Sequence, residues 1–383
     1  MNNIEKLYKY IPNDKVDWEL INNEIFSPYV DRLKNTMQEV KWHGEGNVYN
    51  HTVMVVEKLI TLDEYKELTK YEKLIVFLSA LFHDIGKAVC TRITNDEITS
   101  YNHAIVGSVM LREYMWVSLG LSGEKYQSFR EAVCMLVRYH STPIHNYNDL
   151  EKRVIKLSLN TSLTNDFTLK LLIILAKADA LGRIGSEYEE HLLNIEVFYE
   201  QAKRSECLTE AFIFSNPFTK YQYLKTDNMW PYHDFYDNTK GTIILLCGLP
   251  GTGKDTFIKN NYPNMPVISL DDIRKEFNIL PTENQTKVYE IAKERAKVYL
   301  RNKQEFIWNA TNLTNLIRNK QLSLFHGYNY SVKIIFLETD LETNLLRNKD
   351  REKVVDEKVI YKMLSNINIP EAFEAEEVEW ICV

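Results

Sequence analysis

Apolar residues recur at helical spacing through residues 53–139, as in VMVVEKLI and EKLIVFLSALF, and strand-like alternation is scarce there. A second helical block covers residues 154–198 and contains the run LKLLIILAKADALGRI, whose apolar density predicts a buried helix. We expect the two blocks to close one domain. The pattern therefore predicts an all-α domain over residues 1–207.

The helical pattern of apolar residues ends in the segment between residues 208 and 240. FSNPF, YQY, NMWPYHD and DNTKG are rich in aromatic residues, proline, asparagine and aspartate. Such clusters mark turns and irregular segments. We expect an ordered connector here.

A different pattern begins at residue 241. TIILLCG is an apolar run of strand length that ends in a glycine-rich turn, and helical text follows from Asp255. PVISL, EFIWNAT and VKIIFLE read as further strands with helical stretches between them. Strands that alternate with helices imply a parallel sheet. We predict an α/β domain over residues 241–383, so the fold class is multidomain.

Composition supports this division. The chain has 383 residues, 45% hydrophobic and 26% charged, which is ordinary for a globular protein with two domains. No apolar run approaches the roughly 20 residues that cross a bilayer, and the first residues lack the apolar stretch of a signal peptide. Five cysteines are scattered without a CxxC pair, so reduced thiols are expected. These features predict a cytoplasmic protein with no membrane partner.

The net charge of -7 disfavours a protein that coats nucleic acid, because phosphate contacts depend on Lys and Arg. An enzyme that grips only a strand end needs basic residues only locally.

The segment GLPGTGKDT has the spacing of a phosphate-binding P-loop. Glycines let backbone N–H groups converge on phosphates, and the lysine meets the β/γ oxygens. The segment follows a predicted strand and opens a predicted helix, as the motif requires. We expect ATP, or another nucleoside triphosphate, with Mg²⁺ to bind through Gly248, Gly251, Thr252, Gly253, Lys254, Asp255 and Thr256.

One position departs from the motif. Asp255 follows the lysine, where a Ser or Thr hydroxyl normally ligates Mg²⁺. An aspartate can hold the ion directly or through water. The alternative is that Asp255 only stabilises the helix start.

A carboxylate pair and an arginine follow the second predicted strand in SLDDIR. This is the carboxyl end of a parallel strand, where such sheets place their ligands. Phosphoryl transfer to a hydroxyl needs a carboxylate to accept the proton and cations to steady the phosphates. Asp271 and Arg274 would supply both, unless they are only solvated charges at a helix start.

Together GLPGTGKDT, SLDDIR, NATNL and LLRNKDREK resemble the 5′-hydroxyl polynucleotide kinases of phage and bacterial RNA repair. The resemblance implies that Lys254 serves the ATP phosphates, Asp271 is the general base, and Arg274 holds the phosphate beside the acceptor nucleotide. Arg347 and Arg351 would lie on a lid over the β/γ-phosphates. Asn309 departs from this pattern, because an acidic residue is expected in its place.

The helical half carries an ordered set of histidines and aspartates. Any single buried histidine is more often a satisfied core residue than a ligand, so the argument rests on the set. His83 and Asp84 end an apolar helix, where an adjacent polar pair is costly unless something binds it. Imidazole with carboxylate suits first-row divalent metals.

The order of His51, HDIGK with His83 and Asp84, His103, His140 and Asp179 resembles the HD phosphohydrolase superfamily of all-helical metalloenzymes. The resemblance implies that one metal is held by His51, His83, Asp84 and Asp179, and that a second would be held by Asp84, His103 and His140. Lys87 and Lys177 would neutralise a phosphate. N/O ligation leaves Mn, Fe, Co, Ni and Zn open, as one ion or two.

An HD domain followed by a 5′-kinase domain resembles the bacterial HD phosphoesterase and polynucleotide kinase fusions of RNA repair. This resemblance implies removal of 2′,3′-cyclic, 2′- or 3′-terminal phosphates, phosphorylation of 5′-hydroxyl ends, RNA or DNA ends as substrate, and a ligase downstream. One alternative is a nucleotide phosphohydrolase fused to a small-molecule kinase. Another is a nucleotide-switched regulatory protein.

Overall fold

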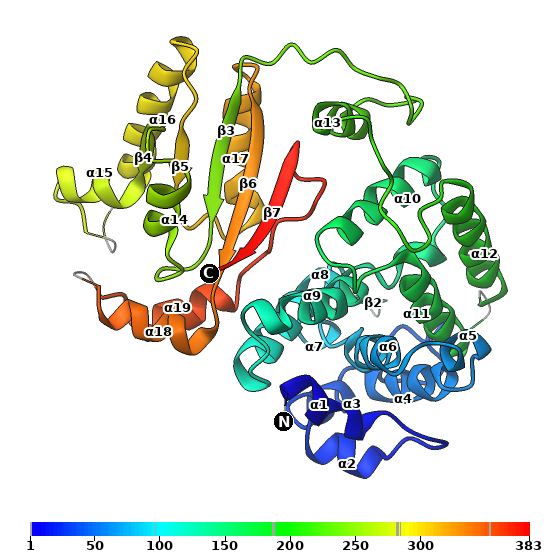
Figure 1. The fold of residues 1–383 in the computed structure, drawn as a ribbon. Helices are drawn as coiled ribbons and strands as arrows, with labels where there is room; N and C mark the ends of the chain where they lie inside the picture. The colour runs from blue at the N-terminus through cyan, green and yellow to red at the C-terminus, as the bar shows by residue number, and fades with distance from the viewer. Residues whose placement is uncertain (1, 96, 186–187, 281–282, 284, 352–353) are drawn as a thin grey trace. The chain divides into compact units, whose positions relative to one another are not determined.

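The computed structural model describes residues 2–95, 97–185, 188–280, 283, 285–351 and 354–383. The chain divides into two compact units, Met1–Phe212 and Ile213–Val383. Figure 1 shows helices throughout the first unit and a sheet flanked by helices in the second. The predicted fold class, an all-α domain followed by an α/β domain with a parallel sheet, is confirmed.

The described part of unit 1 is built from helices with one small hairpin. Its elements are α1 (Asn3–Leu7), α2 (Trp18–Asn23), α3 (Val30–Lys34), α4 (Val48–Leu59), α5 (Asp63–Lys66), α6 (Lys70–Phe82), α7 (Lys87–Cys90), β1 (Arg92–Thr94), β2 (Glu97–Thr99), α8 (His103–Glu113), α9 (Glu124–Tyr139), α10 (Leu150–Ser158), α11 (Leu169–Leu181) and α12 (Tyr188–Arg204).

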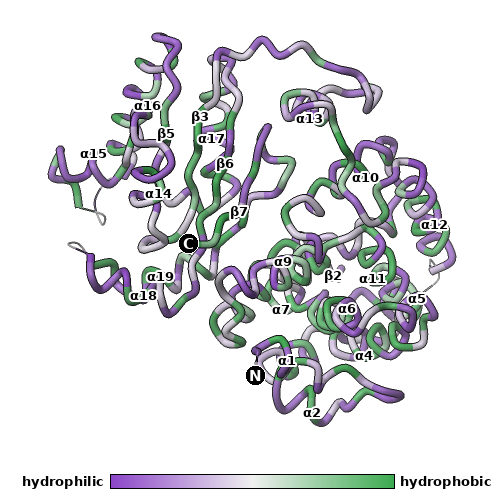
Figure 2. The backbone as a smooth tube through the Cα atoms, viewed as in Figure 1, coloured by the Kyte–Doolittle hydropathy of each residue, from purple (hydrophilic) through white to green (hydrophobic). Residues whose placement is uncertain are grey.

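Helices α6 and α11 form the centre of this unit, and both are buried over most of their length. Figure 2 shows them as largely hydrophobic segments, as expected from their apolar runs. Local sequence sets where they start: Thr69 caps α6 in a capping box with Glu72, and Thr168 caps α11. These caps fix where each helix begins and therefore which residues lie at its other end. Polar side chains are found at those ends.

The β1–β2 hairpin was not predicted. Its strands are three residues long, and Ile93 pairs with Ile98. Because both strands are mostly exposed, they lack the apolar run that would have predicted them. The backbone N–H of Ile98 donates to the Glu39 carboxylate at 3.2 Å, which ties the hairpin to the loop before α4.

Unit 2 contains a five-stranded sheet in the order β4-β5-β3-β6-β7, with parallel pairing at each neighbouring pair. Its elements are α13 (Pro217–Lys225), β3 (Thr242–Cys247), α14 (Lys254–Asn261), β4 (Val267–Ser269), α15 (Leu270–Glu276), α16 (Gln285–Arg301), β5 (Ile307–Asn309), α17 (Asn315–His326), β6 (Ser331–Glu338), α18 (Leu341–Lys349), α19 (Glu357–Leu364) and β7 (Glu377–Cys382).

The four predicted strands are present, and β7 is a fifth that the sequence analysis missed. It is an edge strand whose residues are all half-buried, so EVEWIC lacks the apolar run that marked the inner strands. The chain leaves β3 between β5 and β6, at the point where the strand order reverses. Open α/β sheets bind ligands at this position.

Helix α13 lies in the predicted connector and packs on unit 2. The ring of Tyr221 stacks on His326 with centroids 4.6 Å apart, and the Lys220 ammonium donates to the Ala372 carbonyl at 2.7 Å. The segment after Phe212 is therefore an extension of the second unit. Within the described parts of both units, none of the helices combines the length and apolar character needed to cross a membrane.

Candidate functional site

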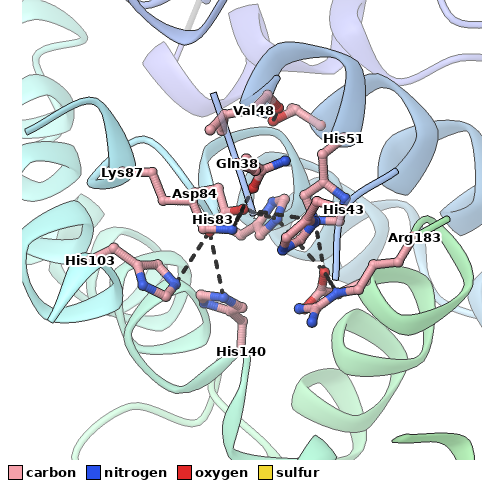
Figure 3. Close-up of polar contacts among 12 residues, drawn as sticks. Gln38, His43, Val48, His51, His83, Asp84, Lys87, His103, His140 and Arg183 are labelled. Atoms are coloured by element: carbon pink, nitrogen blue, oxygen red, sulfur yellow. Dashed lines mark hydrogen bonds and ion pairs between the residues drawn. The ribbon is translucent and has the colours of Figure 1, made fainter. Parts of the chain in front are cut away.

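The six metal-ligand candidates of unit 1 come together in the structure, although they are spread over 129 sequence positions, from His51 to Asp179. Figure 3 shows the imidazoles converging on one centre from separate helices. Within the described chain they form two groups whose ligand atoms lie within 4.8 Å of one another: His51 with His83 and Asp179, and Asp84 with His103 and His140.

The two carboxylates lie at the middle of this cluster. Asp84 Oδ1 is 3.3 Å from His103 Nε2 and 3.9 Å from His140 Nε2. Asp84 Oδ2 is 3.3 Å from His83 Nε2, and Asp179 Oδ1 is 3.0 Å from His51 Nε2. Every imidazole therefore turns its Nε2 towards a carboxylate oxygen.

Backbone carbonyls orient three of these imidazoles. Each ring uses Nδ1 to reach a carbonyl three residues earlier: His83 to Ala80 at 2.7 Å, His103 to Ser100 at 2.8 Å, and His140 to Val137 at 2.7 Å. A hydrogen on Nδ1 leaves the Nε2 lone pair free for a metal, and such partners are usual for histidine ligands.

Two buried atoms of the cluster, His83 Nε2 and Asp84 Oδ1, lack a hydrogen-bond partner in the described structure, whereas Asp84 Oδ2 is paired with the Lys87 ammonium. Leaving buried polar atoms unsatisfied is costly, and a lone pair that faces a carboxylate is repulsive. A divalent cation between them removes both penalties. The residues present therefore fit the metal that an HD domain uses.

The electrostatics of Asp84, Asp179 and His140 favour the protonation states that ligands need. Burial acts to lower the pKa of His51, but its hydrogen bonds with two carboxylates outweigh burial and raise that pKa. Burial opposes ionisation of Asp84, but Lys87 and the neighbouring imidazole outweigh it and hold the pKa well below the usual range. Arg183 does the same for the buried Asp179. Burial lowers the pKa of His140 to about 3, so this ring is neutral at physiological pH. Ionised carboxylates and neutral imidazoles are the forms that bind metal.

Sequence reasoning missed the outer partners of these ligands. Arg183 holds Asp179 through Nη2 to Oδ2 at 2.6 Å and Nε to Oδ1 at 3.2 Å. Glu45 lies 2.9 Å from His51 Nδ1 and 2.8 Å from His43 Nδ1. Arg183 stands one helical turn after Asp179, and His43 and Glu45 lie in WHGEGNVYNHT, so spacing alone offered a signal for them.

The two lysines predicted beside phosphate differ in position. Lys87 is buried, and its ammonium lies 2.7 Å from Asp84 Oδ2 and 2.7 Å from Gln38 Oε1. Lys177 instead pairs with Glu64 and lines a separate groove. Two residues correspond to a rotation of about 200° on a helix, so a side chain there faces away from Asp179. The prediction for Lys177 was wrong.

A cavity of about 610 Å³ opens above the cluster. Ligand sites usually occupy about 300–1,000 Å³, so a nucleotide-sized group fits. Its wall combines cluster residues with polar and aromatic side chains, among them Lys87, His103, His140, Arg183, Trp42, Tyr101, His145 and His191.

The second site lies at the P-loop between β3 and α14. Gly248, Gly251 and Gly253 have φ of 148°, 86° and 80°, in the region that favours glycine. A Cβ on Gly248 would lie 2.6 Å from the Leu337 carbonyl oxygen, so only glycine allows this close path. The first N–H groups of α14 have no intrahelical partner and are therefore available to an anion at the loop.

The Lys254 ammonium donates to the Gly248 and Leu249 carbonyls at 2.9 and 2.8 Å, inside the loop. Burial lowers its pKa to about 8. The Thr252 hydroxyl is also turned inward, to the Leu249 carbonyl at 2.9 Å. Thr252 therefore supports the loop and is absent from the cleft wall, which differs from the predicted nucleotide contact.

A cleft of about 430 Å³ joins the loop to the candidate acceptor residues. Asp271 and Arg274 lie in the first turns of α15, and Arg274 Nη1 is 2.6 Å from Asp271 Oδ1. Arg351 Nη2 is 3.6 Å from the other oxygen of Asp271. The cleft is lined by Gly251, Gly253, Lys254, Asp255, Thr256, Asp271, Arg274, Asn309, Arg347 and Arg351, among others.

Arg347 on α18 and Arg351 in the turn after it, the two arginines expected on a lid, both line this cleft. Figure 1 shows α18 at the end of the sheet where β3 leads into the loop. Residues 352–353 of the LLRNKDREK motif lie outside the described residues.

Two buried amides support the loop and the strand that leads into it, although the sequence analysis gave neither a role. Asn344 Nδ2 donates to the Pro250 carbonyl at 2.8 Å, and Asn312 Nδ2 donates to the Leu246 carbonyl at 2.7 Å. The first joins α18 to the P-loop, and the second joins the segment after β5 to β3, just before the loop begins.

Comparison with known proteins agrees with this division. Residues 48–184 match the family model of the HD domain, and residues 243–370 match that of the AAA domain. A solved structure of a proposed kinase from Chloroflexus aurantiacus is 15% identical, with a TM-score of 0.31, and the match covers 38% of this chain and 86% of that one. That likeness is too low to add to the argument. The chain therefore contains an HD domain over residues 48–184, followed by an AAA domain with a P-loop over residues 243–370.

Proposed function

We propose that this protein heals broken nucleic-acid ends. The HD site removes a 2′,3′-cyclic, 2′- or 3′-terminal phosphate, and the P-loop site phosphorylates a 5′-hydroxyl with ATP. The termini that result are those a ligase joins, so a ligase is expected to act on the product.

At the HD site, His51, His83, Asp84 and Asp179 would hold one divalent ion, and Asp84, His103 and His140 a second. The ion supplies Lewis acidity towards phosphate oxygens and lowers the pKa of a bound water. The chain itself offers cations at the cavity wall: Lys87 and Arg183 are both within ion-pair distance of the ligand carboxylates. They would bind and orient the terminal phosphate.

At the P-loop site, the 5′-hydroxyl oxygen attacks the γ-phosphorus of ATP while the bond to the β-phosphate oxygen breaks and ADP leaves. The hydroxyl proton passes to Asp271, which lines the cleft and has 65% of its side chain exposed. Lys254, Arg347 and Arg351 would steady the nucleotide phosphates. Arg274 would hold the phosphate that follows the acceptor nucleotide.

The Asp271–Arg274 pair carries this proposal. Both residues follow the carboxyl end of β4 and line the same cleft as the loop, which supports a proton acceptor and a phosphate-binding cation there. An acceptor that bears a phosphate next to its hydroxyl, as a strand end does, satisfies both groups.

The test is to incubate the protein with a 5′-hydroxyl RNA oligomer that ends in a 2′,3′-cyclic phosphate, with γ-labelled ATP and Mn²⁺ or Mg²⁺. We expect label at the 5′ end and loss of the cyclic phosphate. A matched DNA oligomer with a 3′-phosphate measures the preference between the two polymers. Reaction of free nucleosides or nucleotides with no reaction of oligomers would favour the small-molecule alternative. Nucleotide binding without transfer to either acceptor would favour the regulatory one.

A further inference from the structure

Two departures from the usual P-loop metal site are in contact here. In such sites the ion is held by a hydroxyl on the residue after the lysine and by a carboxylate supplied from a neighbouring strand. This chain has a carboxylate, Asp255, on the loop, and a neutral amide, Asn309, at the end of β5. Strand β5 pairs with β3 in parallel, with Asn309 opposite Leu246, so both residues reach the same edge of the sheet.

The contact between them is a hydrogen bond from Asn309 Nδ2 to Asp255 Oδ1 at 2.7 Å. Asn309 is 6% exposed, whereas Asp255 is exposed, and both line the cleft beside Lys254. A buried amide that donates to a carboxylate fixes its direction. In the described chain the other oxygen, Asp255 Oδ2, has no hydrogen bond or ion pair.

We propose that the carboxylate and the neutral group have exchanged places: Asp255 on the loop is the anionic ligand of the nucleotide-bound divalent cation, and Asn309, the neutral residue now on β5, positions Asp255. This inference rests on the nucleotide site of the proposed function, and it holds whichever acceptor the enzyme uses. The site keeps one carboxylate and one neutral group, so its net charge matches that of the usual arrangement.

The exchange makes specific demands on substitutions. Asp255→Ser restores the loop hydroxyl but leaves no carboxylate at either position. Asn309→Asp replaces the amide, whose nitrogen now lies 2.7 Å from Asp255 Oδ1, with a second carboxylate. Two carboxylates this close repel each other unless a cation lies between them. The double substitution Asp255→Ser with Asn309→Asp rebuilds the usual arrangement, with the carboxylate on the strand.

The experiment measures the affinity of the full chain for a fluorescent, non-hydrolysable ATP analogue in Mg²⁺ and in EDTA. The readout is the dissociation constant in EDTA divided by the dissociation constant in Mg²⁺. This ratio isolates the contribution of the cation to nucleotide affinity. We expect D255S to reduce this ratio at least about tenfold, as loss of a charged ligand contact does. N309A should reduce it by about tenfold through lost orientation. The double variant D255S/N309D should regain most of the wild-type ratio.

Asp272→Asn is the matched control, because it removes a carboxylate from α15 that does not line the cleft. It should keep the wild-type ratio. The dissociation constant in EDTA should stay near wild type for every variant, which shows that each folds and binds nucleotide.

An unchanged ratio in D255S would mean that Asp255 only stabilises the start of α14. A double variant no better than D255S would show that Asn309 is not the exchange partner. Failure of the wild-type protein to bind the analogue in either condition would overturn the nucleotide site itself, and with it the kinase half of the proposed function. Nucleotide binding with the expected ratios but no transfer to RNA or DNA ends would overturn the acceptor assignment alone.

Discussion

Replacing Asp84 with asparagine tests the metal cluster without relying on a known substrate. Asp84 touches both ligand groups, because its oxygens lie 3.3 Å from His83 and from His103. Asparagine keeps the shape but removes the charge that a divalent ion needs. We predict that D84N loses the ability of Mn²⁺ to stabilise unit 1.

The expected size of this effect follows from the cluster. Two buried atoms, His83 Nε2 and Asp84 Oδ1, lack hydrogen bonds, and each costs about 1–3 kcal/mol. An ion that satisfies them and is present at about 100 times its Kd stabilises the folded state by about 2.7 kcal/mol. For a domain of roughly 150–250 residues each kcal/mol moves Tm by about 2–4 °C, so Mn²⁺ should raise the Tm of unit 1 by about 5–11 °C.

The assay is thermal unfolding of the full chain in EDTA and in Mn²⁺, with the wild-type protein, D84N and D166N compared. Asp166 is the control because it carries the same charge in the same unit and accepts hydrogen bonds from Tyr71 and Ser128. D166N should lose some stability but keep the Mn²⁺ shift. An equal Mn²⁺ shift in the wild-type protein and in D84N would refute the assignment of Asp84 as a ligand.

Three further outcomes are expected. Lys87→Met should lower phosphate release by about tenfold or more, because it removes a cation from the cavity, whereas Lys177→Met should not; equal losses in a phosphatase assay would contradict the placement of the two lysines. Burial lowers the pKa of Lys220 from 10.5 to about 8, so the unfolded chain binds the extra proton between these values and stability rises with pH across this window. Denaturant titrations at pH 7.5 and 9.5 should show that the free energy of unfolding of the wild type rises relative to that of Lys220→Met, by up to about 1.4 kcal/mol for each pH unit. No relative rise would refute the burial of a neutral Lys220. A chain trimmed to residues 213–383 should unfold at higher denaturant than one trimmed to 241–383, because the shorter chain loses the contacts of α13; equal midpoints would show that α13 is only a connector.

The sequence predicted most strongly those features that repeat or that follow a motif. Apolar runs predicted α6, α11 and the inner strands, because an element that is buried on most sides needs a continuous hydrophobic sequence. It did not locate β7, since an edge strand is half-buried and mixes glutamate with apolar residues. The β1–β2 hairpin was missed because its short strands bury little.

Candidate ligands were found by residue type and order, but their supporting partners were not. Glu45 and Arg183 act through contacts with His51 and Asp179 that only the folded chain defines. The prediction for Lys177 failed for the opposite reason. Lys177 is close to Asp179 in sequence, but two positions along a helix put it on the other side of the helix, where it pairs with Glu64. At the P-loop, the sequence showed two departures 54 positions apart, and the structure joined them in one hydrogen bond.

We propose that one chain carries two separate catalytic sites for the two ends of a broken strand. The most direct measurement follows both ends of a 5′-hydroxyl, 2′,3′-cyclic phosphate RNA with wild type, D84N and D271N in parallel. If the sites are separate, D84N still transfers label to the 5′ end but leaves the cyclic phosphate, and D271N does the reverse. Loss of both activities in either variant, with folding intact by thermal unfolding, would contradict it.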